Sequence, residues 1–278
     1  MIYTSTARAA DLAANGEENN PFVAFENVGA SATLSGVATL ADGAAANAFT
    51  GTTYDYWLPV VPVSGACGII MQLPTARNCS FAAIAAHNLS DLGGGVRLYN
   101  SPDGVTYTQI TNVITPSDNA PIAFRLPASG NARQYWSIWF SGLTQDDPLY
   151  VGVAFLGDEL VMPRRFYQGY APVLQPTEVA LQSNVSEGGN YVGSSVVRRG
   201  STLQAQFNHL SPSFVRGDDF QAFQTAFNTG QPFFFGWRPQ KYPEDLHYCW
   251  RTGNAIRPEN TGPKDFMGCQ FSARAYDE

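Results

Sequence analysis

The sequence predicts an all-β protein with two domains, a β-sandwich followed by an antiparallel β-domain that carries one short helix. The chain contains 26 Gly and 18 Pro, residues that break helices. Short runs in which apolar and polar residues alternate recur along it, as half-buried strands require. Turn-forming compositions separate these runs at short intervals, a spacing typical of sandwiches and jelly rolls.

Seven strands are expected in the first part of the chain. The turns between them include the glycine run Gly93–Gly95 and the segments Ser101–Gly104 and Pro127–Gly130, whose residues favour tight reversals. The expected strands are Gly68–Leu73, Phe81–Ala86, Val96–Tyr99, Tyr107–Ile110, Ile122–Leu126, Tyr135–Phe140 and Leu149–Phe155. We therefore assign residues 1–160 to one jelly-roll sandwich with an extended N-terminal arm.

A second β-domain is expected over residues 161–278. Its one helix is predicted to begin at a cap on Asp218, to place Phe220, Phe223 and Phe227 on one face, and to end at Gly230. The expected strands are Thr177–Asn184, Gly193–Arg199, Leu203–His209, Gln231–Trp237 and a closing strand at Met267–Tyr276.

Composition excludes several classes of partner and compartment. The 16 basic and 23 acidic residues leave a net charge of -7, which disfavours nucleic acid. The longest charge-free run, Tyr56–Ala76, is interrupted by three prolines and does not predict a membrane span. The first residues lack the pattern of a signal peptide, so we expect synthesis in a reducing cytosol with free thiols at the four cysteines.

No catalytic constellation emerges from the residues that usually supply one. His87, at the end of an apolar strand, is expected to pin its loop by a hydrogen bond, and His209 and His247 are expected to be structural. No flanking pattern nominates a serine as a nucleophile. Acidic pairs such as Asp158-Glu159 are expected to be solvated loop charges, because neighbours in a strand point to opposite faces. We predict no enzyme.

The sequence predicts no metal and no cofactor. His247, Cys249 and Cys269 could supply three soft ligands, but a fourth zinc ligand is missing. The cysteines are better explained as small buried hydrophobic residues. A calcium ion held by loop carboxylates at Asp42, Asp55 or Asp91 is left open.

Aromatic and arginine side chains are the main candidates for contact surfaces. Phe, Trp and Tyr make up 13% of the chain, and only two of the 16 basic residues are lysine. Trp136 and Trp139 lie three apart in one strand, so one should face the core and the other solvent or a partner. Flat aromatic faces with polar rims suit sugar stacking or protein docking, and arginine suits interface ion pairs. The predicted contact residues are Tyr54, Trp57, Trp136, Trp139, Arg164, Arg165, Arg198 and Arg199.

Three segments in the first half resemble a galactose-binding-like, or discoidin-type, jelly roll. They are Ala46–Trp57 with its loop tryptophan, Ile69–Leu73 followed by Ala83–Leu89, and the strand, Asp-Gly turn and strand of Val96–Tyr107. The resemblance covers about residues 22–156. It implies a fold that often binds glycans through loops at one end, sometimes beside a structural calcium.

The whole chain resembles structural proteins of tailed bacteriophages. The residues that carry this resemblance are Leu160–Phe166, Gly188–Ser194 and Pro232–Pro243, in a final domain similar to the ring-forming domain of distal-tail or tail-tip hubs. It implies a virion component, assembled in the host cytoplasm, that contacts other tail proteins and forms a homo-oligomeric ring. Closed rings arise from heterologous contacts between copies.

Two other functions remain open at the level of sequence. One is a carbohydrate-binding receptor-recognition module, or a capsid or collar decoration protein, with contact to a host-surface glycan. The other is a glycan hydrolase, which would need two carboxylates facing each other across a cleft.

Overall fold

The computed structural model describes residues 1–166, 178–261 and 263–276, and it confirms the all-β class. The chain divides into two compact units. Of the described residues, the first unit comprises Met1–Met162 and Phe234–Leu246, and the second comprises those of Pro163–Phe233 and those from His247 to Tyr276. The sequence does not signal the return of Phe234–Leu246 to the first unit. Whether residues 1–160 and 161–278 fold as independent domains stays a prediction.

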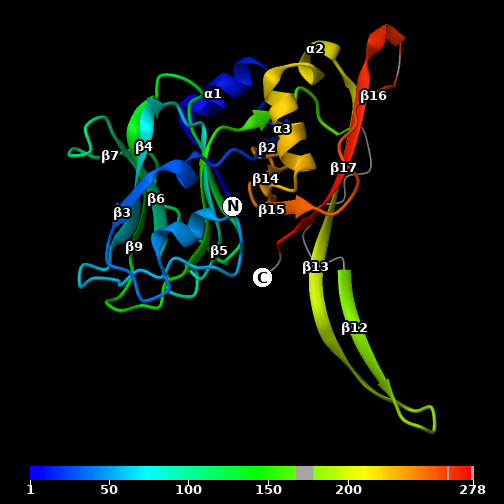
Figure 1. The fold of residues 1–278 in the computed structure, drawn as a ribbon, viewed down its shortest axis with the longest axis horizontal. Helices are drawn as coiled ribbons and strands as arrows, with labels where there is room; N and C mark the ends of the chain where they lie inside the picture. The colour runs from blue at the N-terminus through cyan, green and yellow to red at the C-terminus, as the bar shows by residue number, and fades with distance from the viewer. Residues whose placement is uncertain (167–177, 262, 277–278) are drawn as a thin grey trace. The chain divides into compact units, whose positions relative to one another are not determined.

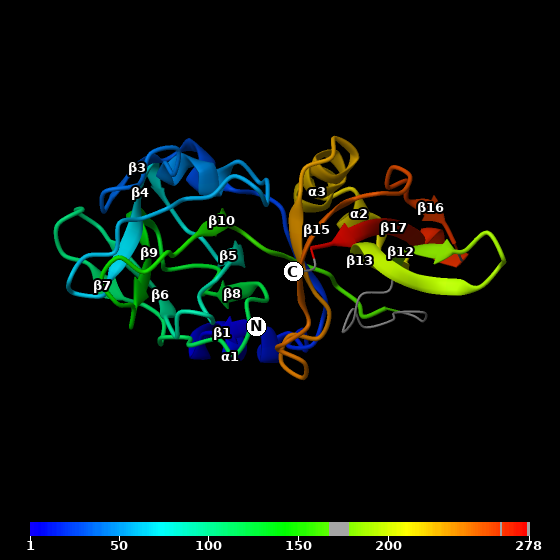
Figure 2. The same cartoon turned by 90° about the horizontal axis from the view of Figure 1, so that it is seen from below.

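The first unit is a sandwich of two sheets (Figures 1 and 2). A four-stranded sheet has the order β1 (Ile2–Thr4), β8 (Ile122–Arg125), β5 (Phe81–His87) and β10 (Val151–Gly157). A five-stranded sheet has the order β3 (Thr33–Gly36), β4 (Cys67–Arg77), β9 (Arg133–Ser141), β6 (Gly95–Ser101) and β7 (Thr108–Gln109). All neighbours pair antiparallel except β1 and β8.

The core of this sandwich follows from alternation in the strands. On β4, Ile69, Met71 and Leu73 are buried, while the residues between them are more exposed. They share one apolar cluster with residues of the opposite sheet, including Ile84 and Phe124. β5 is instead buried along its whole length, because its other face is covered as well. Small alanines suit a strand that is packed on both faces.

Shorter elements of the first unit cover the four-stranded sheet. Helix α1 (Thr6–Ala14) is capped by Ser5, whose hydroxyl accepts a hydrogen bond from the Arg8 N–H. Phe22 and Phe234 pack their rings against Phe81 at centroid distances of 5.6 and 5.8 Å. The remaining elements are β2 (Phe22–Ala24), β11 (Leu160–Val161), β14 (Phe233–Gly236) and the 3-10 turns η1 (Val28–Ser31) and η2 (Ala45–Phe49).

A buried Arg–Glu–Arg group corrects one expectation about the acidic pairs. The Glu159 carboxylate is fully buried and accepts hydrogen bonds from Arg8 Nη2 at 2.7 Å and from Arg125 Nε at 2.6 Å. The expectation of a solvated charge is therefore wrong for Glu159. Desolvation of the three charges is offset by their mutual pairing, and the guanidinium of Arg125 also lies 4.6 Å from the Phe22 ring centroid.

The second unit contains an antiparallel sheet of β12 (Glu178–Val185), β13 (Tyr191–Leu210), β17 (Met267–Ala275) and β15 (Leu246–Arg251), with β16 (Glu259–Asn260) on β17. Its helices are α2 (Pro212–Val215) and α3 (Asp218–Asn228), beside the turn η3 (Pro263–Asp265). As predicted, Phe220, Phe223 and Phe227 are buried on one face of α3. The cap is Gly217 and not Asp218, which lies in the first turn, where its negative charge complements the helix dipole.

Candidate binding and assembly surfaces

The two tryptophans proposed as contact residues at Trp57 and Trp136 are buried. Each exposes 1% of its surface, so Trp57 offers no contact surface, and Trp136 is the member of the Trp136–Trp139 pair that faces the core. Trp57 lies in a loop by sequence, but its backbone pairs with Val151 through two hydrogen bonds of 2.9 and 3.1 Å. That pairing turns the indole into the core, 5.6 Å from the Phe140 ring. Trp136 points inward from β9 by strand alternation.

The other predicted aromatic residues lie at the surface. Tyr54 is 73% exposed in the loop after η2. Trp139, three residues after Trp136 on β9, is half-buried on the opposite face of the five-stranded sheet. These two residues belong to different parts of the sandwich, so they do not form one site.

The predicted arginines lie in the second unit. Arg164 and Arg165 are exposed, and the Arg164 guanidinium lies 6.0 Å from the ring centroid of Phe266. Arg198 and Arg199 occupy β13 opposite Ala180 and Val179, and of these two arginines only the backbone position is described. Their role in contacts stays a prediction.

A further candidate surface, not anticipated by the predicted contact residues, is the hairpin formed by β12 and the first part of β13, residues 178–200 (Figure 1). β13 is twenty residues long, and only its second part, from Ser201, pairs with β17. Every residue from Leu181 to Val196 is exposed except the half-buried Gly193. The β12–β13 hairpin is therefore a two-stranded ribbon with no other described strand beside it.

The two faces of the β12–β13 hairpin differ in chemistry. Leu181 lies opposite Val196, and Val185 lies opposite Tyr191, with exposed fractions between 47% and 69%. Leu181 and Val185 are four residues apart on β12, so the two pairs lie on one face, with the Ser183–Ser194 pair between them and a register shift after Asn184. The other face carries polar pairs such as Gln182 opposite Ser195. An isolated hairpin is marginally stable in water, and a group of large apolar side chains exposed on one face marks an interaction site.

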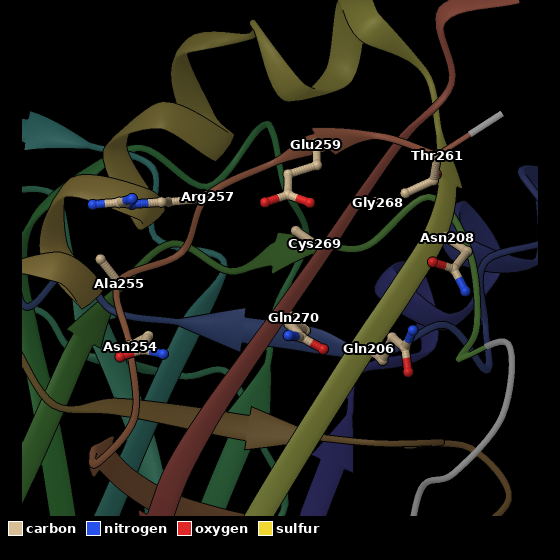
Figure 3. Close-up of a pocket in the computed structure, with 10 residues that line it drawn as sticks. All are labelled: Gln206, Asn208, Asn254, Ala255, Arg257, Glu259, Thr261, Gly268, Cys269 and Gln270. Carbon is tan, nitrogen blue, oxygen red and sulfur yellow. The ribbon is translucent and has the colours of Figure 1, made fainter.

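A polar groove of about 320 Å³ lies elsewhere on the second unit (Figure 3). Gln206 on β13 lies opposite Gln270 on β17, with Asn208 further along β13. Arg257 and Glu259 complete the charged lining, and Glu259 is the one carboxylate among the described residues that line the groove. Cys269 also lines it, but burial raises the pKa of its thiol to about 12, so it is protonated at neutral pH. This chemistry suits hydrogen bonding and lacks the paired carboxylates of a glycosidase.

Buried titratable groups serve the fold. The Nδ1 of His87 accepts a hydrogen bond from the Leu89 N–H at 3.4 Å, which confirms that this histidine pins its loop. Burial lowers the pKa of His87 to about 4, so the imidazole is neutral at pH 7. The four cysteines are free and buried, as predicted. Within the described ranges, no group of three or more His, Cys, Asp or Glu side chains could hold a metal ion.

The outer face of the five-stranded sheet carries a group of half-buried aromatic and polar side chains. Trp139 lies opposite Arg97, and Tyr99 lies opposite Gln109. The Tyr99 and Trp139 rings meet edge-on, with centroids 6.3 Å apart and planes at 77°. We call these four residues the aromatic face.

No family model matches the chain, and no curated protein matches its sequence. Similar solved structures include a CBM32 module of Clostridium perfringens in complex with GalNAc-β-1,3-galactose, with a TM-score of 0.40 and 10% identity over 48% of this chain and 99% of that one. A chitosan-binding module from Paenibacillus sp. IK-5, in complex with chitotriose, has a TM-score of 0.40 and 12% identity over 47% and 99% of the two chains. A GH29 fucosidase of Ruminococcus gnavus has a TM-score of 0.41 and 10% identity over 49% of this chain and 27% of its own.

The first unit has a jelly-roll fold. Its strand pairing and shared core establish this within the chain itself. The first two similar structures are carbohydrate-binding modules, and the third is an enzyme. Among the helices of the described residues, none combines the length and the hydrophobicity that crossing a membrane requires.

Proposed function

We propose that the protein is a non-catalytic assembly protein that joins copies of itself through the β12–β13 hairpin. The observation that carries this proposal is the apolar face of the hairpin, formed by Leu181, Val185, Tyr191 and Val196. While this face is exposed to water, the two-stranded hairpin has little to stabilise it. Contact with a second copy would bury the four side chains, and burial of apolar surface stabilises by about 25 cal/mol per Å².

The edge of β12 supports the same role. β12 is the last strand in the order of its sheet, so one side of its backbone is unpaired within the described residues. An unpaired edge is a template for adding a strand from another chain. If each copy docks its hairpin on the next copy, the contact is heterologous and can close into a ring. This is the arrangement implied by the resemblance to distal-tail and tail-tip proteins, and we assign the protein to the virion of a tailed phage.

Light scattering on two matched double variants tests the assembly role. Leu181→Asp with Val196→Asp places two charges on the apolar face, and Gln182→Asp with Ser195→Asp places the same charges on the polar face. We expect the wild type and the polar-face variant to be oligomers, with masses of at least twice 30.1 kDa, and the apolar-face variant to be a monomer. A wild type that stays monomeric at high concentration, or equal loss in both variants, would overturn the proposal.

A second candidate function is glycan binding by the first unit, on its own or beside assembly. The observation that favours it is the aromatic face, where flat rings and polar groups lie together at the surface of a jelly roll. Binding of an oligosaccharide that is lost on Trp139→Ala while the assembled mass persists is the expected result. Binding unchanged in that variant would count against the aromatic face.

A further inference from the structure

Trp139 packs against the five-stranded sheet over a glycine on the neighbouring strand. Gly68 lies directly opposite Trp139 in the β4–β9 pairing. A Cβ atom added at Gly68 would lie 2.4 Å from Cε3 of the indole, so this edge of the ring occupies the space that a side chain at position 68 would take. Any other residue at position 68 would displace the ring. The glycine therefore fixes the position of the indole on this side of the sheet.

Tyr99 and Gln109 border this surface on β6 and β7. The edge-on contact of the Tyr99 ring restricts the tilt of the indole. The Tyr99 hydroxyl donates to Gln109 Oε1 at 3.5 Å, a long hydrogen bond. The amide of Gln109 is exposed, so the rim of the aromatic face offers both donors and acceptors to a ligand.

Arg97 gives the aromatic face a positive charge with no acidic partner. Its guanidinium lies 5.3 Å from the centroid of the Tyr99 ring, and its Nη1 donates to Gln109 Oε1 at 3.4 Å. The ion pairs of the described residues use Arg8, Arg77 and Arg125, and none includes Arg97. The Nε of Arg97 is buried without a hydrogen-bond partner. Arg97 therefore places a guanidinium without an acidic partner opposite Trp139, where an anion can bind.

We propose that the aromatic face binds an acidic saccharide, with a pyranose ring on the Trp139 indole and a carboxylate on the Arg97 guanidinium. The apolar face of a sugar ring is flat and matches an exposed indole face. A guanidinium and a carboxylate form paired, charge-assisted hydrogen bonds, which add specificity to the stacking. This inference rests on glycan binding as the second candidate function and names its ligand class and its residues.

Calorimetry with trigalacturonate and its methyl ester tests the ligand class, because the ester removes the charge and keeps the sugar rings. We expect the wild type to bind the acid more tightly than the ester. Arg97→Gln should lower the affinity for the acid by roughly 10- to 100-fold, the range that hydrogen bonds to charged groups contribute, and leave the ester unaffected. Trp139→Ala should abolish binding of both probes. Val63→Ala, at a residue that is 80% exposed and was not a predicted contact residue, is the control and should change neither affinity.

The outcomes separate the two levels of the proposal. Equal affinity for the acid and the ester, both lost in Trp139→Ala, would overturn the acidic ligand class and keep glycan binding. Binding that is kept in Trp139→Ala would overturn the site. Absence of binding to either probe would overturn both the site and the glycan-binding function for this saccharide class. Thermal unfolding of each variant checks that the sandwich remains folded.

Discussion

The two parts of strand β13, before and after Ser201, differ in how their side chains are buried. From Ser201 to Phe207, buried and more exposed residues alternate, with Leu203, Ala205 and Phe207 in the core. From Tyr191 to Val196, no residue is buried. Both parts are paired to a neighbouring strand along their length. Backbone hydrogen bonding is therefore common to both, and the difference is whether a layer of side chains covers one face of the ribbon.

The comparison teaches where the hairpin must obtain its stability. Phe207 stacks on Phe271 at a centroid distance of 6.4 Å, so the second part of β13 is held by a core within its own unit. Val196 and Tyr191 in the first part are also large hydrophobic side chains, but their exposed fractions are 47% and 69%. Since apolar burial is the main stabilising contribution, the first part depends on a surface outside the described chain.

The largest expected effect comes from removing one aromatic ring from the covered part. Phe207→Ala should lower the free energy of unfolding by about 3–5 kcal/mol, because it leaves a cavity in a packed core. Val196→Ala, the matched change in the hairpin, should change it by less than about 0.5 kcal/mol in the monomer. Urea unfolding of both variants under monomeric conditions measures the contrast. Similar losses of stability in the two variants would contradict the claim that only the second part of β13 is stabilised by a core within its own unit.

The next largest effect concerns acid. The folded-state pKa of His87 is about 4 against an ordinary value of 6.5, because burial disfavours the charged imidazole. Between these values the unfolded chain binds a proton that the folded chain does not, so the free energy of unfolding falls as the pH is lowered. The full contribution is about 3 kcal/mol, at 1.36 kcal/mol per pKa unit. His247, whose pKa is also lowered to about 4 by burial, acts in the same direction.

This acid sensitivity belongs to the covered parts of the molecule, since residues 178–200 contain no histidine. Urea unfolding of the wild type and of His87→Gln at pH 7 and pH 4.5 measures how much His87 contributes to the loss of stability in acid. We expect the variant to lose less stability between the two pH values than the wild type does. An equal loss in both proteins would contradict the assignment.

Several features of the fold could be predicted from the sequence because local periodicity carries them. The phenylalanines of α3 recur at helical spacing, and the alternation in β4 marks its buried face. Long-range features could not be predicted in this way. Trp57 has the sequence context of a loop, and only its pairing with Val151 turns it inward. Glu159 is buried because Arg8 and Arg125, far apart in sequence, meet it.

The candidate surfaces were predictable only in part. The three-residue spacing of Trp136 and Trp139 separates a core residue from a surface residue, but it does not say which is which. The apolar face of the β12–β13 hairpin was missed because the expected strands Thr177–Asn184 and Gly193–Arg199 do not by themselves show what packs against them. Alternation shows that a strand has an apolar face, and only the structure shows that nothing in the described chain covers it.

Hydrogen exchange at two protein concentrations tests the central claim, that the β12–β13 hairpin is covered by another copy of the chain. The account predicts that backbone amides from Leu181 to Val196 exchange fast at low concentration and become protected at high concentration. Amides from Leu203 to Phe207 should be protected under both conditions, because their cover belongs to the same unit. Protection of the hairpin that is equal at both concentrations, or absent at both while the mass increases, would contradict the account.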